Sequence, residues 1–193
     1  MLRNLKNPQQ HQLHHRTHQL NGIIIMSELD VIDRDETETK IRNADFEHIK
    51  FRGHLHNGKL VAEGVLADQE AIDDIPVGIY VIEKDGTLVS CNKTAIAAWG
   101  RSPALGASEK YCGAHILRYP SGDVMPHASA PPSVVINNGG TVRNADVICE
   151  QPSGQRLLAL VNVFPIRNEN DEVVGAVNVF RHNTSKTVAG LNV

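Results

Sequence analysis

The chain has 193 residues, 41% of them hydrophobic, enough for one domain with an appendage or for two very small domains. Its formal net charge is only −3, so it lacks the basic excess typical of nucleic-acid-binding domains. Three cysteines without a C-x-x-C pair argue against a disulfide scaffold and against a four-cysteine zinc site. No run of 18 apolar residues is present, so we expect no membrane span and a cytoplasmic protein.

Residues 1–26 form a leader rich in histidine and glutamine, and its composition predicts disorder because it has little to bury. Met26 offers an alternative start of translation. Two histidine pairs have the i,i+4 spacing that can chelate a metal on a helix: His11/His15 and His14/His18. A solvated tail is the simpler interpretation of these histidines.

Residues 27–71 form an acidic N-terminal extension, which we consider a candidate dimerisation element. Within it, Asn57-Gly58 lies between short apolar stretches and suits a type I′ β-hairpin, whose central residues need positive φ. The apolar pattern from Leu60 to Ile72 instead indicates a helix. The two interpretations compete over residues 60–62 and stay open at this level.

From residue 72 onward, short strands and helices alternate. The expected elements are strands at 77–82 and 87–91, a helix capped by Asn92 and ending at Trp99, a helix at 129–138, and strands at 141–150, 156–164 and 172–181. Two strands, small helices and a three-stranded meander predict an α+β domain. We expect one five-stranded antiparallel sheet with short helices across one face.

Several short motifs in this order resemble the PAS domain family, in particular the sensor PAS domains found ahead of bacterial histidine kinases. The motifs are the entry strand Ile-Pro-Val-Gly-Ile-Tyr-Val-Ile at 75–82, Asp85-Gly86 with Leu88-Val-Ser-Cys-Asn-Lys-Thr-Ala, Lys110-Tyr-Cys-Gly, Met125-Pro-His, Pro152-Ser-Gly and Pro165-Ile-Arg-Asn. The resemblance implies a PAS domain over residues 72–185, followed by a flexible tail at 186–193. It also implies a small pocket between the helices and the sheet, and a sensing or dimerising role.

PAS domains host haem, flavin, metabolites, metal ions or nothing, so the resemblance leaves the cofactor unknown. Haem would need an axial ligand, and His115 and His127 are the candidates, although each is more simply explained as a surface or capping histidine. A photochemical flavin adduct is disfavoured because the Asn-Cys-Arg-Phe-Leu-Gln motif of that branch has no counterpart here. Cys112, in Tyr-Cys-Gly-Ala, is interpreted as a structural thiol.

The sequence Val-Asn-Val-Phe occurs twice, at 161–164 and 177–180, in the last two expected strands. A hairpin turning at Asn170 would pair residues whose numbers sum to 340, which places Asn162 opposite Asn178 on one face. The predicted ligand wall therefore consists of Leu160, Asn162, Phe164, Asn178 and Phe180. Tyr111 and His115 are the predicted gating residues. A slip of one residue would uncouple the two amides, and a solvent-exposed face is the simpler alternative.

These observations favour a stand-alone PAS sensory or regulatory domain that binds a small ligand and transmits by protein–protein contact. We expect a homodimer or a signalling protein recruited in trans, because Arg181-His182-Asn183-Thr184 departs from the Asp-Ile-Thr exit of the family and little chain follows. The alternative is a ligand-free homodimerisation module. A small α+β enzyme ranks third, since no catalytic motif is present and the Asp73-Asp74 pair suits a capping role.

Overall fold

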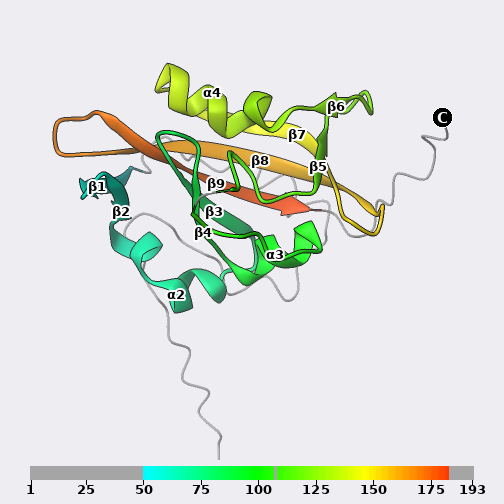
Figure 1. The fold of residues 1–193 in the computed structure, drawn as a ribbon, viewed down its shortest axis with the longest axis horizontal. Helices are drawn as coiled ribbons and strands as arrows, with labels where there is room; N and C mark the ends of the chain where they lie inside the picture. The colour runs from blue at the N-terminus through cyan, green and yellow to red at the C-terminus, as the bar shows by residue number, and fades with distance from the viewer. Residues whose placement is uncertain (1–49, 107, 183–193) are drawn as a thin grey trace, which may run out of the picture.

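The computed structural model describes residues 50–106 and 108–182. Within them, one curled antiparallel sheet has α3 (Lys93–Trp99) and α4 (Pro131–Asn138) on one face. Residues 51–75 pack on the other face. Figure 1 shows α4 running along the long strands, and β1 and β2 at the end of the sheet where β8 turns into β9. The leader, residues 27–49 of the extension and the tail lie outside the described residues.

The expected five-stranded sheet is present in the order β4-β3-β9-β8-β7, and β5 and β6 extend it beyond β7. Its strands are β3 (Gly78–Glu83), β4 (Leu88–Cys91), β5 (Ile116–Arg118), β6 (Val124–Met125), β7 (Val142–Glu150), β8 (Arg156–Arg167) and β9 (Val173–His182). The fold is therefore the α+β arrangement that the sequence predicts. Strand β3 reads as a continuous apolar run because both of its faces are buried.

Both predicted helices form, but the second is split. Helix α3 has Asn92 as its N-cap and Gly100, with φ 63°, at its C-terminus. The helix predicted at 129–138 consists of a 3-10 turn, η3 (His127–Ser129), followed by α4. Ala130 separates the two in an extended conformation, with ψ 152°, because a residue that precedes proline disfavours the helical region.

The predicted hairpin also forms, and the predicted helix from Leu60 to Ile72 is wrong. Strands β1 (Phe51–His56) and β2 (Lys59–Ala62) pair across Asn57 and Gly58, whose φ values are 52° and 77°. The rest of that segment forms η2 (Gly64–Ala67) and α2 (Gln69–Asp73). Pairing of Leu60 with Leu55 in the hairpin removes it from any helix, and Gly64, with φ 64°, interrupts the remainder.

Two apolar clusters lie on opposite faces of the sheet. The first lies between the sheet and the two helices and includes Trp99, Leu117 and Val163. The second joins residues 51–75 to the other face and includes Phe51, Ile72 and Ile166. Strand β1 reaches this face because Phe51 pairs in parallel with Ile166, and the rings of Phe51 and Phe164 lie 5.6 Å apart.

The predicted register of the β8–β9 hairpin is wrong by one residue. The turn lies where expected, since Arg167 pairs with Val173, but a bulge follows and Ile166 pairs with Gly175. From there on, paired residues sum to 341, so Asn162 lies opposite Val179 and Asn178 opposite Val163. Because side chains alternate along a strand, the slip places the two asparagines on opposite faces of the sheet.

Candidate functional site

A cavity of about 30 Å³ lies between the sheet, the end of α3 and the start of α4. Strands β7 and β8 contribute small and apolar side chains: Val147, Cys149, Ala159 and Val161. Trp99 closes it from α3, and Ala130 and Pro131 close it from the start of α4. Among the described residues, the lining contains no Lys, Arg, His, Asp or Glu. Its titratable groups are the Tyr80 phenol and the thiols of Cys112 and Cys149.

Three aromatic rings form one side of the cavity. The rings of Tyr80 and Trp99 have centroids 5.3 Å apart, and Trp99 stacks on Phe180 at 6.4 Å with 22° between the ring planes. Phe180 lies directly over Gly78, where an added Cβ would come within 2.3 Å of the ring. The glycine is therefore required for the close approach of Phe180 to β3.

Asn178 and Tyr80 supply the polar atoms of the wall. Asn178 Nδ2 donates to Tyr80 Oη at 2.8 Å, and the Tyr80 hydroxyl also interacts with the Cys112 side chain. Asn178 is 3% exposed, and among the described residues no donor reaches its Oδ1 atom. Buried acceptors are nearly always paired, so this oxygen is an exception among the buried polar atoms of the described residues.

Burial keeps the titratable groups of the cavity neutral. It raises the pKa of Cys112 to about 11 and that of Cys149 to about 12, and it also raises the pKa of Tyr80. The thiolate is the reactive form of cysteine, so neither thiol is activated as a nucleophile at neutral pH. The cavity therefore offers apolar contact and hydrogen bonding and no charge.

The structure separates the predicted ligand wall into two groups. Asn178 and Phe180 line the cavity. Leu160, Asn162 and Phe164 lie on the opposite face of β8, and Phe164 belongs to the second apolar cluster. Asn162 Oδ1 accepts a hydrogen bond from the backbone N–H of Asn144 at 3.0 Å, where β7 departs from regular pairing. Its evident role is to hold this irregular part of β7.

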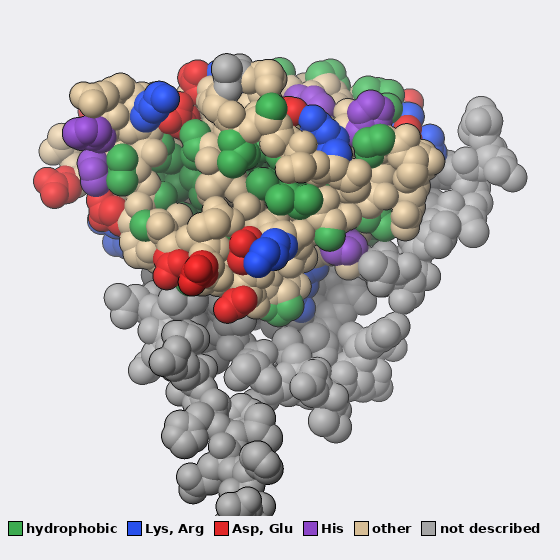
Figure 2. All heavy atoms as spheres, turned by 60° about the horizontal axis from the view of Figure 1, so that its bottom comes forward, with side chains coloured by type: hydrophobic (Ala, Val, Ile, Leu, Met, Phe, Trp, Pro, Cys, Tyr) green, Lys and Arg blue, Asp and Glu red, His purple; other side chains and the backbone are tan. Residues whose placement is uncertain are grey.

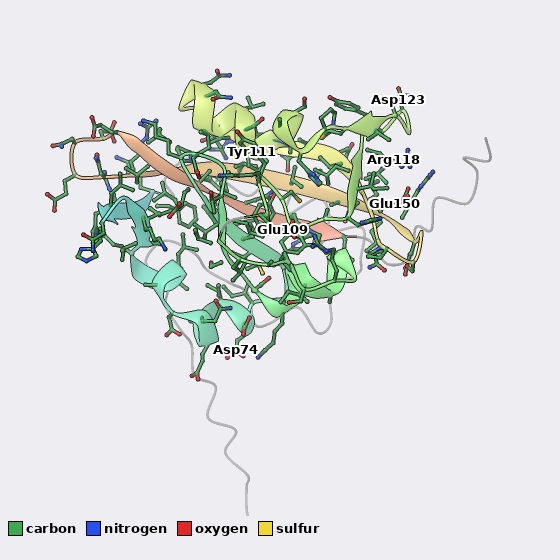
Figure 3. All side chains as sticks on the ribbon, viewed as in Figure 1. Asp74, Glu109, Tyr111, Arg118, Asp123 and Glu150 are labelled. Carbon is green, nitrogen blue, oxygen red and sulfur yellow. The ribbon has the colours of Figure 1, made fainter. Side chains whose placement is uncertain are left out.

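The two predicted gating residues lie outside the cavity lining. Tyr111 has φ 66°, and its ring would collide with a Cβ on Gly86, so it packs over the β3–β4 turn. Tyr111 and Glu109, both labelled in Figure 3, belong to the segment between α3 and β5. His115 lies in the same segment and is exposed.

Residues outside the predicted ligand wall complete the cavity. Tyr80, Trp99, Cys112 and Cys149 come from four separate segments of the chain. The sequence contains a partial signal for Tyr80. Side chains two residues apart on a strand share a face, so Tyr80 lies on the face of β3 where Gly78 meets Phe180. The others are brought together by tertiary packing alone.

The cavity in this conformation does not fit haem. A volume of about 30 Å³ accommodates one or two water molecules, whereas pockets for larger ligands measure roughly 300–1,000 Å³. Neither His115 nor His127 lines it, and burial lowers the pKa of His127. Among residues 50–106 and 108–182, no group of three or more His, Cys, Asp and Glu side chains could hold a metal ion.

In the acidic pair Asp73-Asp74, Asp73 has the predicted capping role. Asp73 Oδ1 accepts from the backbone N–H of Lys93 at 2.9 Å, at the start of α3, and its other carboxylate oxygen lies 3.4 Å from Lys93 Nζ. Figure 2 shows acidic side chains gathered beside a basic one on the face that carries α2. Asp74, labelled in Figure 3, lies at the edge of the fold.

Comparison with known families identifies the fold. A family model described as PAS domain matches residues 76–185, more than half of the chain. The chain belongs to the PAS domain family. PAS domains are signal-sensing modules and are sensory rather than catalytic, and the cavity described here lies between the PAS sheet and its helices.

Three solved structures are similar to this chain at low sequence identity. The PAS domain of a protein from Colwellia psychrerythraea is 21% identical, with 60% of this chain and 92% of that chain covered and a TM-score of 0.43. The PAS domain of the fruit-fly ELK potassium channel is 20% identical, with 60% and 93% covered and a TM-score of 0.47. The light-state dimer of the fungal blue-light photoreceptor Vivid is 15% identical, with 81% and 98% covered and a TM-score of 0.43.

A comparison with curated proteins gives no match. In the described part of this PAS chain, no helix has the length and apolar character needed to cross a bilayer.

Proposed function

We propose that this PAS domain is a sensory module that binds a small ligand in the cavity and transmits the event through a protein–protein contact. The observation that carries the proposal is the unpaired Oδ1 atom of Asn178, buried beside three aromatic rings. An unsatisfied buried acceptor costs about 1–3 kcal/mol, so a molecule that donates a hydrogen bond to it gains more than a surface contact would.

A route for transmission passes through β9 and β3. Asn178 and Phe180 face the cavity from β9, while Val177 and Val179 on the same strand pack against the second apolar cluster. Phe180 lies directly over Gly78, so a ligand that pushes Phe180 toward β3 would displace the β3 backbone there. The contact that responds would lie on the side of residues 51–75, and its partner would be a second copy of the chain or a signalling protein recruited in trans.

The three cysteines support a reducing compartment such as the cytoplasm as the site of action. Cys91, Cys112 and Cys149 are all buried and free. Disulfides form where the compartment is oxidising, and free buried thiols are the usual state of cysteines in the cytosol.

Native mass spectrometry of the freshly purified full chain, with a visible absorption spectrum, tests ligand binding. We expect a bound mass that is lost in Asn178→Leu, a change of similar volume that removes the carboxamide. Asn162→Leu is the matched control, because that asparagine lies on the opposite face, and we expect it to retain the bound mass. Equal loss in both variants, or no bound mass in the unmodified chain after incubation with cell extract, would contradict the proposal.

The second candidate function is a ligand-free homodimerisation module. It is favoured by the exposure of two large apolar side chains on the β1–β2 hairpin, Leu55 at 52% and Val61 at 41%. The double variant Leu55→Glu and Val61→Glu should then convert a dimer into a monomer in light scattering coupled to size exclusion. Asn178→Leu should leave the dimer unchanged under this alternative.

A further inference from the structure

We infer that the ligand of this cavity is a compact, uncharged, flat molecule that donates an N–H or O–H hydrogen bond to Asn178 Oδ1. The inference rests on the proposed function and specifies the ligand chemistry. Three independent features of the cavity lead to it: the orientation of the Asn178 carboxamide, the absence of charged side chains from the lining, and the shape of the aromatic walls.

The orientation of the Asn178 carboxamide follows from its neighbours. Asn178 Nδ2 donates a hydrogen bond to Tyr80 Oη at 2.8 Å. The phenol oxygen is the acceptor of this bond, so the amide nitrogen of Asn178 faces Tyr80. The oxygen Oδ1 then faces away from Tyr80 and lacks a donor among the described residues. A ligand with an N–H or O–H group can supply that donor.

The absence of charged side chains from the cavity lining also restricts the charge that the ligand can carry. Among the described residues, no Lys, Arg, His, Asp or Glu lines the cavity. Burial raises the pKa of Cys112 to about 11 and that of Cys149 to about 12, so both thiols are neutral at pH 7. An anion or a cation would be buried here without a counter-charge, which is costly. A carboxylate, phosphate or ammonium is therefore excluded as the group held at Asn178.

Size and shape favour a small ring. The cavity measures about 30 Å³, so a five-membered ring enters only when the lining side chains shift, and a larger ligand must displace them further. Trp99 and Phe180 lie nearly parallel, with 22° between their planes, and Tyr80 is tilted by 59° to Trp99. Aromatic walls pack best against flat molecules, either stacked or edge-to-face. A five-membered aromatic ring combines small volume, flatness and a single donor.

Pyrrole and furan are suitable probes because they have similar size and shape, and only pyrrole carries an N–H donor. We would titrate each into the ¹⁵N,¹³C-labelled full chain and follow the side-chain resonances of Asn178 and the indole N–H of Trp99. We expect pyrrole to bind about tenfold more tightly than furan, the effect of one hydrogen bond to a buried acceptor. The Asn178 carboxamide resonances should move with pyrrole and not with furan.

Two variants complete the test. In Asn178→Leu the preference for pyrrole should fall from about tenfold to none, and in the control Asn162→Leu it should persist. If Asn178→Leu fails to fold, the Asn178 carboxamide resonances of the unmodified chain still decide the question. Pyrrole-2-carboxylate should bind at least tenfold more weakly than pyrrole because its charge has no partner in the cavity.

The outcomes separate the inference from the proposed function. Equal binding of pyrrole and furan, or tighter binding of the carboxylate, overturns the inference about ligand chemistry while the cavity still binds a ligand. If neither ring perturbs the resonances of Trp99 and Asn178, the cavity admits no small molecule, and the proposed function fails together with the inference.

Discussion

At the scale of single residues, Asn92 connects three segments of the fold. It is fully buried, and its Oδ1 accepts from the backbone N–H groups of Ile79 and Ala95, both at 2.9 Å. Its Nδ2 donates to the carbonyls of Ile72 and Val77 at 2.9 and 2.8 Å. One side chain therefore joins the end of α2, the start of β3 and the first turn of α3.

Asn92→Ala should lower the free energy of unfolding by about 4 kcal/mol, because buried donors and acceptors lose their partner at once. Chemical unfolding followed by circular dichroism measures the change. Thr94→Ala is a control on the same helix, since Thr94 Oγ1 makes one hydrogen bond, to the Ile75 carbonyl at 3.1 Å, and we expect a loss of only about 1 kcal/mol there. Equal losses in the two variants would refute the special role of Asn92.

Asp85 provides a test of local electrostatics outside the cavity. The Lys110 ammonium lies 2.6 Å from its carboxylate, and the backbone N–H of Thr87 donates to it at 2.8 Å. Hydrogen bonding, first of all from Lys110, lowers the pKa of Asp85 from 3.8 to about 2. Since the folded pKa is the lower one, its stabilising contribution is present above pH 4 and is lost as the pH falls toward 2.

Lys110→Met should therefore raise the pKa of Asp85 toward its ordinary value, in a titration followed by the ¹³C shift of the carboxyl group. The ion pair is largely exposed, with Asp85 at 63% and Lys110 at 41%, so we expect little change in overall stability near neutral pH. An unchanged pKa in the variant would show that the turn backbone, and not Lys110, controls this carboxyl group.

At the scale of elements, the glycine of β3 and the turn glycine of the β1–β2 hairpin fulfil different requirements. Gly78 has a φ outside the left-handed region, but an added Cβ would meet the Phe180 ring at 2.3 Å. Gly58 has φ 77°, and an added Cβ would meet nothing within 4 Å. The first glycine allows a close approach of side chain to strand, and the second allows a backbone conformation.

Gly78→Ala should displace Phe180 and cost about 2 kcal/mol, as overpacking in a core does. Trp99 is the single tryptophan of the chain and stacks on Phe180, so its fluorescence should change. Gly58→Ala should cost about 1 kcal/mol from backbone strain and leave the fluorescence as it is. Unchanged emission in Gly78→Ala would contradict the close packing of Phe180 over β3.

At the scale of the whole molecule, the family match and the folding unit have different N-terminal limits. The match to the PAS family begins at residue 76. The second apolar cluster, however, includes Phe51, Leu66 and Ile72 packed against Phe164 and Ile166. Without residues 50–75, this face of the sheet would be exposed to water.

A chain that begins at residue 76 should therefore be less stable than one that begins at residue 50. Each large apolar side chain uncovered costs about 1.5–3 kcal/mol, so several together should remove cooperative unfolding or cause aggregation. Thermal unfolding and binding of a hydrophobic dye measure both effects. Equal melting temperatures for the two chains would show that the segment is an accessory and not part of the core.

The sequence alone predicts a substantial part of this molecule because many of its signals are local. Asn92 and Gly100 bound α3, Asn57-Gly58 specifies the first hairpin, and the turn around Asn170 lies where the sequence places it. These features depend on backbone dihedral angles and hydrogen bonds within a few residues. The ordered motifs from residue 75 onward likewise predicted the PAS fold and its sheet.

Tertiary structure alone decided which residues face the cavity. The bulge between the two last strands changes the register by one residue, and a one-residue change sends every following side chain of a strand to the opposite face. Asn178 consequently points into the cavity, while Asn162 holds the irregular part of β7. Tyr80, Trp99 and Cys112 join the site through contacts between distant segments, which no local pattern encodes.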